Sequence, residues 1–118
     1  LGKLAVAELI HRSDVDPASV DLLTFGTVIP SVLAPNIARE IALMPLLPKG
    51  VQAWSVSRAC ASANQAITDA ADQIALGQRL VGEGTSVREA AKLLKCHHAT
   101  LYRALNHPAQ MPVHRSTR

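Results

Sequence analysis

The stretch that decides the fold runs from Val56 to Ile67 and reads VSRACASANQAI. The apolar segment 51–57 is typical of a strand, whereas the small residues after Cys60 favour a helix. The sequence therefore predicts a thiol at the start of a helix, where unpaired N–H groups and the helix dipole favour a thiolate. A thiolate is a good nucleophile, which makes Cys60 the candidate catalytic residue. The competing interpretation is a buried structural cysteine, because free cysteine is among the most buried residue types.

The elements predicted on either side of Cys60 alternate between helices and strands. Helices are expected at 1–13, from Asn36 onward and at 61–77, and strands at 22–29 and 51–57. Asp16 and Asn36 are expected to cap helical turns. The last helix should have one apolar face, formed by Ala63, Ile67, Ala70, Ala71 and Ile74. The order α-β-α-β-α implies two parallel strands with helical crossovers.

The stretch around Cys60 resembles the nucleophile motif of the thiolases, the acyl-CoA C-acyltransferases, and most of all the thiolases of fatty-acid oxidation. That motif has an aliphatic residue, then Asn, Ser or Thr, two free positions, and Cys. A small residue, a Ser or Thr and another small residue follow. The positions that fit are Val56, Ser57, Cys60, Ala61, Ser62, Ala63, Ala66, Ile67 and Ile74. The similarity covers residues 1–78 and includes 20–28 (VDLLTFGTV) and 36–43 (NIAREIAL), which resemble the family's second strand and following helix.

The resemblance implies that Cys60 accepts the acyl group of an acyl-CoA substrate, with no other cofactor. Catalysis in the family also relies on histidines, a second cysteine and an oxyanion hole from later parts of the chain. We therefore expect this chain to be catalytically incomplete by itself. The fold class predicted for it is an α/β fragment, an incomplete thiolase-like half. Because two parallel strands make a poor sheet with open edges, we also expect marginal stability or a homo-oligomer.

The resemblance ends at Gln78, and the composition changes there. Residues 1–78 carry five basic and seven acidic side chains, for a net charge of −2, whereas residues 79–118 carry +5. Ser86 and Glu89 form a capping-box pattern that predicts a short helix, and a second helix is expected from His98 to Leu105. Two short helices around a tight turn indicate an all-α helix-turn-helix. Its positive charge suits a polyanion.

Residues 86–94 (SVREAAKLL) and 99–105 (ATLYRAL) resemble the C-terminal DNA-binding unit of serine resolvases and invertases. Lys95 departs from that family, whose turn usually has Gly, and a positive φ at this lysine implies strain. The unit also needs a preceding helix, for which 72–81 is the candidate, and in that case 61–81 is one helix despite Gly77. The resemblance implies DNA contacts through His97, His98, Thr100, Tyr102 and Arg103. The alternative is a solvated basic face.

Other features exclude several classes of protein. No apolar run approaches the roughly 20 residues of a membrane span. Two cysteines, Cys60 and Cys96, do not make a disulfide scaffold, so a reduced, cytoplasmic setting is expected. No metal site is expected, because Cys96, His97 and His98 are adjacent and lack the usual ligand spacing.

These observations divide the chain into a partial thiolase N-terminal domain at 1–78, a helix-turn-helix at 79–107 and a disordered tail at 108–118. The first functional hypothesis is a thiolase-family acyltransferase segment that carries the acyl-accepting Cys60. The second is a DNA-binding protein that uses residues 86–105, with the thiolase piece as a scaffold or dimerisation surface. The third is a chimera, a recombined reading frame without a selected function.

Overall fold

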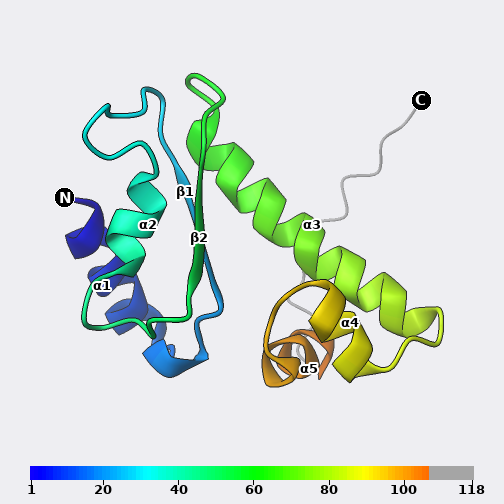
Figure 1. The fold of residues 1–118 in the computed structure, drawn as a ribbon. Helices are drawn as coiled ribbons and strands as arrows, with labels where there is room; N and C mark the ends of the chain where they lie inside the picture. Colours follow the sequence, from blue (N-terminus) through cyan, green and yellow to red (C-terminus); the bar gives the residue numbers. More distant parts are fainter. Residues whose placement is uncertain (107–118) are drawn as a thin grey trace. The chain divides into compact units, whose positions relative to one another are not determined.

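The computed structural model of the chain describes residues 1–106, and the tail expected to be disordered, 108–118, lies outside them (Figure 1). The chain divides into two compact units, Leu1–Ala75 and a second unit that begins at Leu76. The helix α3 (Ser62–Gly82) belongs to both, and the boundary expected at residue 78 falls inside it. None of the helices within residues 1–106 is long and apolar enough to cross a membrane.

The first unit contains a two-stranded parallel sheet. Its strands are β1 (Leu22–Gly26) and β2 (Gln52–Val56), which pair residue by residue along their whole lengths. The helices α1 (Gly2–Ser13) and α2 (Ile37–Ala42) lie on one side of this sheet (Figure 1). The predicted mixed α/β arrangement with two parallel strands is therefore confirmed.

The core of the first unit lies among α1, α2 and the sheet. Its buried residues are Val6, Ile41, Ala42, Met44, Leu47 and Val51. Leu23 and Phe25 of β1 and Ala53 of β2 pack against this cluster. Because these three residues alternate along their strands with residues on the opposite face, the core covers one face of the sheet.

Two predicted caps begin the helical segments of this unit. The Asp16 carboxylate accepts the Ala18 N–H at 2.9 Å at the start of a 3-10 turn, Pro17–Ser19. The Asn36 side chain accepts the Arg39 N–H at 3.2 Å at the start of α2. The Ser55 hydroxyl donates to the same Asn36 oxygen at 3.0 Å, which fixes the beginning of α2 to β2.

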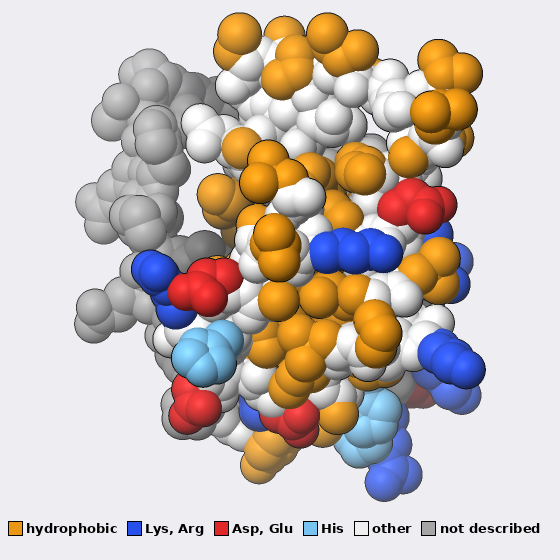
Figure 2. All heavy atoms as spheres, turned by 90° about the vertical axis from the view of Figure 1, so that its left-hand side faces the viewer, with side chains coloured by type: hydrophobic (Ala, Val, Ile, Leu, Met, Phe, Trp, Pro, Cys, Tyr) orange, Lys and Arg blue, Asp and Glu red, His pale blue; other side chains and the backbone are white. Residues whose placement is uncertain are grey.

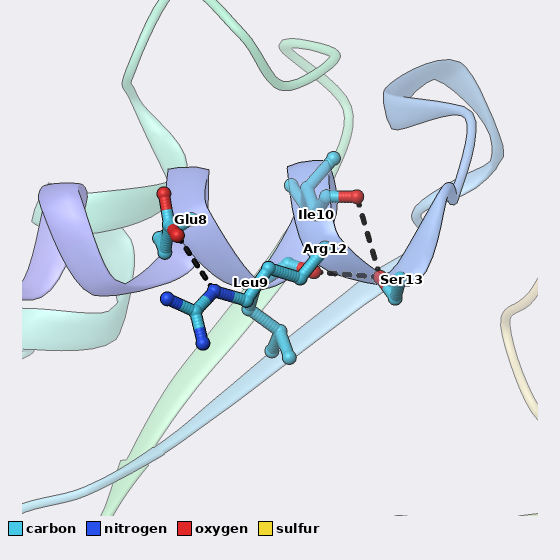
Figure 3. Close-up of polar contacts among 5 residues, drawn as sticks. All are labelled: Glu8, Leu9, Ile10, Arg12 and Ser13. Carbon is cyan, nitrogen blue, oxygen red and sulfur yellow. Dashed lines mark hydrogen bonds and ion pairs between the residues drawn. The ribbon is translucent and has the colours of Figure 1, made fainter.

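The end of α1 is held by local polar contacts, which Figure 3 shows. The Ser13 hydroxyl donates to the Leu9 carbonyl at 2.7 Å. The Arg12 guanidinium pairs with the Glu8 carboxylate at 2.6 Å, one helical turn away. Both side chains of this pair are exposed, so it stabilises the helix by no more than about 0.5 kcal/mol. Asp14 then ends the helix with a φ of 52°.

The strand expected at 22–29 ends earlier, at Gly26. The last bond of the ladder joins the Thr27 N–H to the Val56 carbonyl at 2.9 Å. The next residues, Val28 and Ile29, are exposed and lead into Pro30, which has no N–H to continue the pairing. The apolar character of 28–29 therefore belongs to a loop and not to the strand.

Large hydrophobic side chains remain exposed on the first unit. Figure 2 shows many of them gathered on the side where α1 lies in Figure 1, and Leu4 and Leu9 of α1 are 72% and 65% exposed. The apolar face predicted for α3 is also open, since Ile67 is 69% and Ile74 39% exposed. These surfaces are consistent with marginal stability or self-association, which stays a prediction.

The second unit is helical over the residues described, and consists of 76–82 of α3 with α4 (Val87–Leu93) and α5 (His98–Asn106). Ala90, Ala91 and Leu101 form its buried centre. A Cβ added at Gly77 would lie only 2.6 Å from Leu101 Cδ1. The glycine therefore allows α5 to approach α3, and α3 continues through it to Gly82. The helix was expected to end at residue 77, and it extends five residues further, to Gly82. It is therefore one continuous helix, as the resemblance to a helix-turn-helix unit requires.

The turn between α4 and α5 is a Schellman motif. Lys95 has a φ of 53°, as expected for the residue that replaces glycine there. The Cys96 N–H donates to the Ala91 carbonyl at 3.0 Å, and the Lys95 N–H donates to the Lys92 carbonyl at 3.2 Å. These two backbone bonds close the turn and offset its strain.

Candidate functional site

Cys60 lies in the turn between the end of β2 and the start of α3. Its side chain is exposed, so the interpretation as a buried structural cysteine is wrong. The helix begins at Ser62, two residues after the cysteine, and its first-turn N–H groups point back toward the turn. The structure thus combines an accessible thiol with a helix N-terminus, which is the arrangement that the motif predicts.

The backbone directly before the cysteine is left-handed. Ala59 has a φ of 44°, a conformation that costs a residue with a Cβ roughly 1 kcal/mol. An isolated parallel β-bridge pairs Arg58 with Cys60, on either side of Ala59. This conformation could not be predicted from the sequence, because alanine carries no signal for a positive φ.

Ser62 holds this turn together. Its side chain is 2% exposed, and its hydroxyl accepts the Arg58 N–H at 2.8 Å. The same hydroxyl donates to the Ala59 carbonyl at 2.7 Å. Ser62 was not among the predicted site residues, although it occupies the Ser or Thr position of the nucleophile motif, which is the signal that marks it.

The turn rests on the end of β1. A Cβ added at Gly26 would lie 2.5 Å from the carbonyl carbon and oxygen of Ser62, so only glycine permits this approach. The Ser57 hydroxyl also donates to the Val28 carbonyl at 3.0 Å. The carboxyl ends of both parallel strands therefore support the segment that carries the thiol.

A chain of polar side chains follows the turn into α3. An Arg58 guanidinium nitrogen donates to Gln65 Oε1 at 2.5 Å, and Gln65 Nε2 donates to Asp69 Oδ1 at 2.6 Å. Arg58 is thereby directed along the first turns of the helix. The only carboxylate in this network is that of Asp69, which accepts from Gln65 seven residues beyond the start of α3, and the arginine, serine and amide of residues 58–65 are not general bases at neutral pH.

The described histidines belong to other parts of the chain. His11 is exposed in the last turn of α1, and His97 and His98 lie at the start of α5. Within residues 1–106, no group of three or more His, Cys, Asp or Glu side chains is placed to hold a metal ion.

The predicted DNA-contacting residues lie on or next to α5. His97, His98, Tyr102 and Arg103 are exposed, whereas Thr100 is half-buried. Arg103 Nε donates to the Ala99 carbonyl of the preceding helical turn at 3.3 Å. The guanidinium is therefore folded back along its own helix in this state.

His97 caps the start of α5. Its Nδ1 accepts the Ala99 N–H at 3.3 Å, and its carbonyl accepts the Thr100 N–H at 3.0 Å. Its ring lies 4.3 Å from the ring of His98, measured between centroids. The two histidines are brought together, and His97 has a structural role that the sequence analysis did not assign to it.

Known proteins resemble the part of the chain that contains this turn. Residues 1–83 match the family described as thiolase, N-terminal domain, which extends the expected resemblance past residue 78. The 3-ketoacyl-CoA thiolases of Erwinia tasmaniensis, Serratia proteamaculans and Pseudoalteromonas translucida are 44%, 48% and 46% identical to this chain over 82 residues. That segment is 70% of this chain and 19% of each relative, so the chain spans about a fifth of the length of these curated relatives.

Proposed function

This chain belongs to the thiolase N-terminal domain family, and on that premise we propose that Cys60 accepts the acyl group of an acyl-CoA thioester. The observation that carries the proposal is the exposed thiol of Cys60, which lies in the strand-to-helix turn formed by the nucleophile motif. The relatives are named 3-ketoacyl-CoA thiolases, and their name supports an acyl-CoA as the substrate class.

The proposed step is one half-reaction. Cys60 gives up its proton, and its Sγ bonds to the carbonyl carbon of the thioester. The bond between that carbon and the sulfur of coenzyme A breaks, and the coenzyme A thiolate takes up a proton. Because Arg58, Ser62 and Gln65 offer no general base at the turn, onward transfer of the acyl group is proposed to need further catalytic residues.

The test is to incubate the protein with acetyl-CoA and to locate the acyl group by peptide mass spectrometry. The expected product is a hydroxylamine-sensitive thioester on the peptide that contains Cys60. Cys60→Ala should abolish it, and Cys96→Ala, the matched control, should leave it. Failure to acylate Cys60, or equal acylation of both cysteines, contradicts the proposal.

We propose as a second function that the second unit binds DNA through α5. Lys95, with its positive φ, turns the chain between α4 and α5 where such DNA-binding units have glycine. The observation that favours this function is the excess of basic charge within residues 76–106, where five exposed basic side chains against two acidic ones supply charge for phosphate contacts. The basic residues are Arg79, Arg88, Lys92, Lys95 and Arg103, and the acidic ones are Glu83 and Glu89.

Fluorescence anisotropy with a labelled random-sequence duplex tests this second function. We expect binding at low salt that weakens steeply as salt increases, because phosphate contacts release counterions. Arg103→Ala should weaken the binding, whereas Arg12→Ala, an exposed arginine of the first unit, should not. If the duplex does not bind at low salt, the second function is excluded.

A further inference from the structure

The geometry points to Ser62 as the positioning residue for the nucleophile. We infer that its buried hydroxyl holds the turn 58–62 in the conformation that presents Cys60 Sγ to a thioester. The inference rests on the proposed acceptance of an acyl group by Cys60. Among the described residues, Ser62 is the only polar residue that is buried, at 2% exposure, although residues 57–60 are exposed.

The two hydrogen bonds of the hydroxyl reach across the cysteine. Ser62 lies two positions after Cys60, and its partners, the Arg58 N–H and the Ala59 carbonyl, lie before it. The bonds of 2.8 and 2.7 Å therefore close a ring around the residue that carries the thiol. Cys60 is placed at the outer side of that ring, where its side chain is exposed.

Two backbone bonds also cross the turn, but they do not replace the hydroxyl. The Ala61 N–H donates to the Arg58 carbonyl at 2.9 Å, and the Ser62 N–H donates to the Ala59 carbonyl at 3.2 Å. Neither bond involves the Arg58 N–H, which donates to the Ser62 hydroxyl. Removing the hydroxyl leaves that partly buried donor without its acceptor, which disfavours this form of the turn.

The left-handed Ala59 makes the turn sensitive to that loss. Alanine prefers a negative φ by a ratio on the order of tenfold or more, so the observed φ of 44° needs bonds that hold it. The hydroxyl supplies such a bond directly to the Ala59 carbonyl. Its anchor is fixed, because the Ser62 backbone packs against Gly26 with no room for a Cβ.

The experiment measures the rates at which acetyl-CoA and iodoacetamide modify Cys60, with Cys96 of the same chain as the internal reference. The variants are Ser62→Ala, Ser62→Thr and the control Thr68→Ala, whose lost hydroxyl donates to the Asn64 carbonyl on the exposed side of α3. We expect Ser62→Ala to slow both reactions of Cys60 about tenfold, following the φ preference of alanine. Ser62→Thr keeps the hydroxyl and fits the motif, so it should retain the wild-type rates, as should Thr68→Ala.

Three results would overturn the inference. In the first, Cys60 of the Ser62→Ala variant is modified at the wild-type rate. In the second, Ser62→Ala lowers the modification rates of Cys60 and Cys96 equally. In the third, Cys60 is modified as slowly in Ser62→Thr as in Ser62→Ala. The two reagents keep this test distinct from that of the proposed function. If acetyl-CoA does not acylate Cys60 in the wild-type protein, the proposed function fails, and the iodoacetamide rates still decide the role of Ser62.

Discussion

Two turns of this chain place a cysteine directly after a residue with a left-handed backbone. Ala59, with a φ of 44°, precedes Cys60, and Lys95, with a φ of 53°, precedes Cys96. Cys60 is exposed, whereas Cys96 is half-buried and packs against the centre of the second unit. The same local backbone therefore leads to two different environments for a thiol.

The difference lies in what holds each turn. Two backbone bonds of the Schellman motif close the turn at Lys95 and end α4. The turn at Ala59 depends in addition on the buried hydroxyl of Ser62. A left-handed residue alone does not mark a functional turn. A buried polar side chain that holds such a residue next to an exposed thiol is the stronger indication.

The largest expected effect comes from a substitution in the buried centre of the second unit, against which Cys96 packs. Leu101 is 3% exposed at the centre of the second unit, so Leu101→Ala should lower the free energy of unfolding of that unit by about 2–5 kcal/mol. Alkylation of Cys96 should accelerate, and alkylation of Cys60 should not. Urea titration followed by circular dichroism and peptide mapping of the alkylated cysteines measure the two effects.

Leu93→Ala is the matched control, because Leu93 is 67% exposed on α4. It should change the free energy of unfolding by no more than about 0.5 kcal/mol. Equal effects of the two substitutions would contradict the assigned core.

A smaller effect on the stability of the second unit is expected from a substitution at Lys95. Lys95→Gly should stabilise the second unit by about 1 kcal/mol, since glycine adopts a positive φ without steric cost. Lys92→Gly, inside α4, should destabilise it by about the same amount. Urea titrations of both variants should therefore shift in opposite directions, and a destabilising Lys95→Gly would refute the left-handed turn.

The corresponding substitution at Ala59 tests how the first turn is held. If the Ser62 hydroxyl acts by holding Ala59 at a positive φ, glycine at 59 needs less of that help. The double variant Ala59→Gly/Ser62→Ala should therefore recover most of the Cys60 alkylation rate that Ser62→Ala loses. A double variant as slow as Ser62→Ala would mean that the hydroxyl acts in some other way.

The smallest effect concerns the capping box of α4. The Ser86 hydroxyl donates to the Glu89 carboxylate at 2.7 Å, and the Ser86 N–H donates to the same carboxylate. These two bonds lower the pKa of Glu89 below its ordinary value, and the nearby positive charge of Lys92 lowers it further. A carboxylate with a lowered folded pKa stabilises the fold above its ordinary pKa, and this stabilisation is lost as the pH falls through the folded value.

The urea midpoint of the wild-type protein should accordingly fall between roughly pH 5 and pH 3. Glu89→Gln should remove part of that decline. Glu83→Gln, which removes an exposed acid of the same unit, is the control and should not remove it. Identical pH profiles for the wild type and Glu89→Gln would show that the capping box makes no pH-dependent contribution.

Features that depend on neighbours in sequence could be predicted. The caps at Asp16, Asn36 and Ser86 join atoms only two or three residues apart, so their residue types suffice. The parallel pair of strands followed from the alternation of helices and strands. The strand and the helix on either side of Cys60 likewise followed from the motif.

Features that depend on distant partners could not be predicted. The apolar face of α3 was visible in the sequence, but periodicity does not say what covers it, and Ile67 is exposed. Gly77 does not end α3, because Leu101 packs where its side chain would lie. The left-handed Ala59 has no signal of its own, since the hydroxyl that holds it comes from the next helix.

The central claim is that the fold makes Cys60 the reactive thiol of this chain. The most direct measurement is the ratio of the iodoacetamide rates of Cys60 and Cys96 in one sample, in native buffer and in concentrated urea. We expect Cys60 to react faster than Cys96 in the native protein and the two rates to converge in urea. Equal rates in the native protein, or a difference that persists in urea, would contradict it.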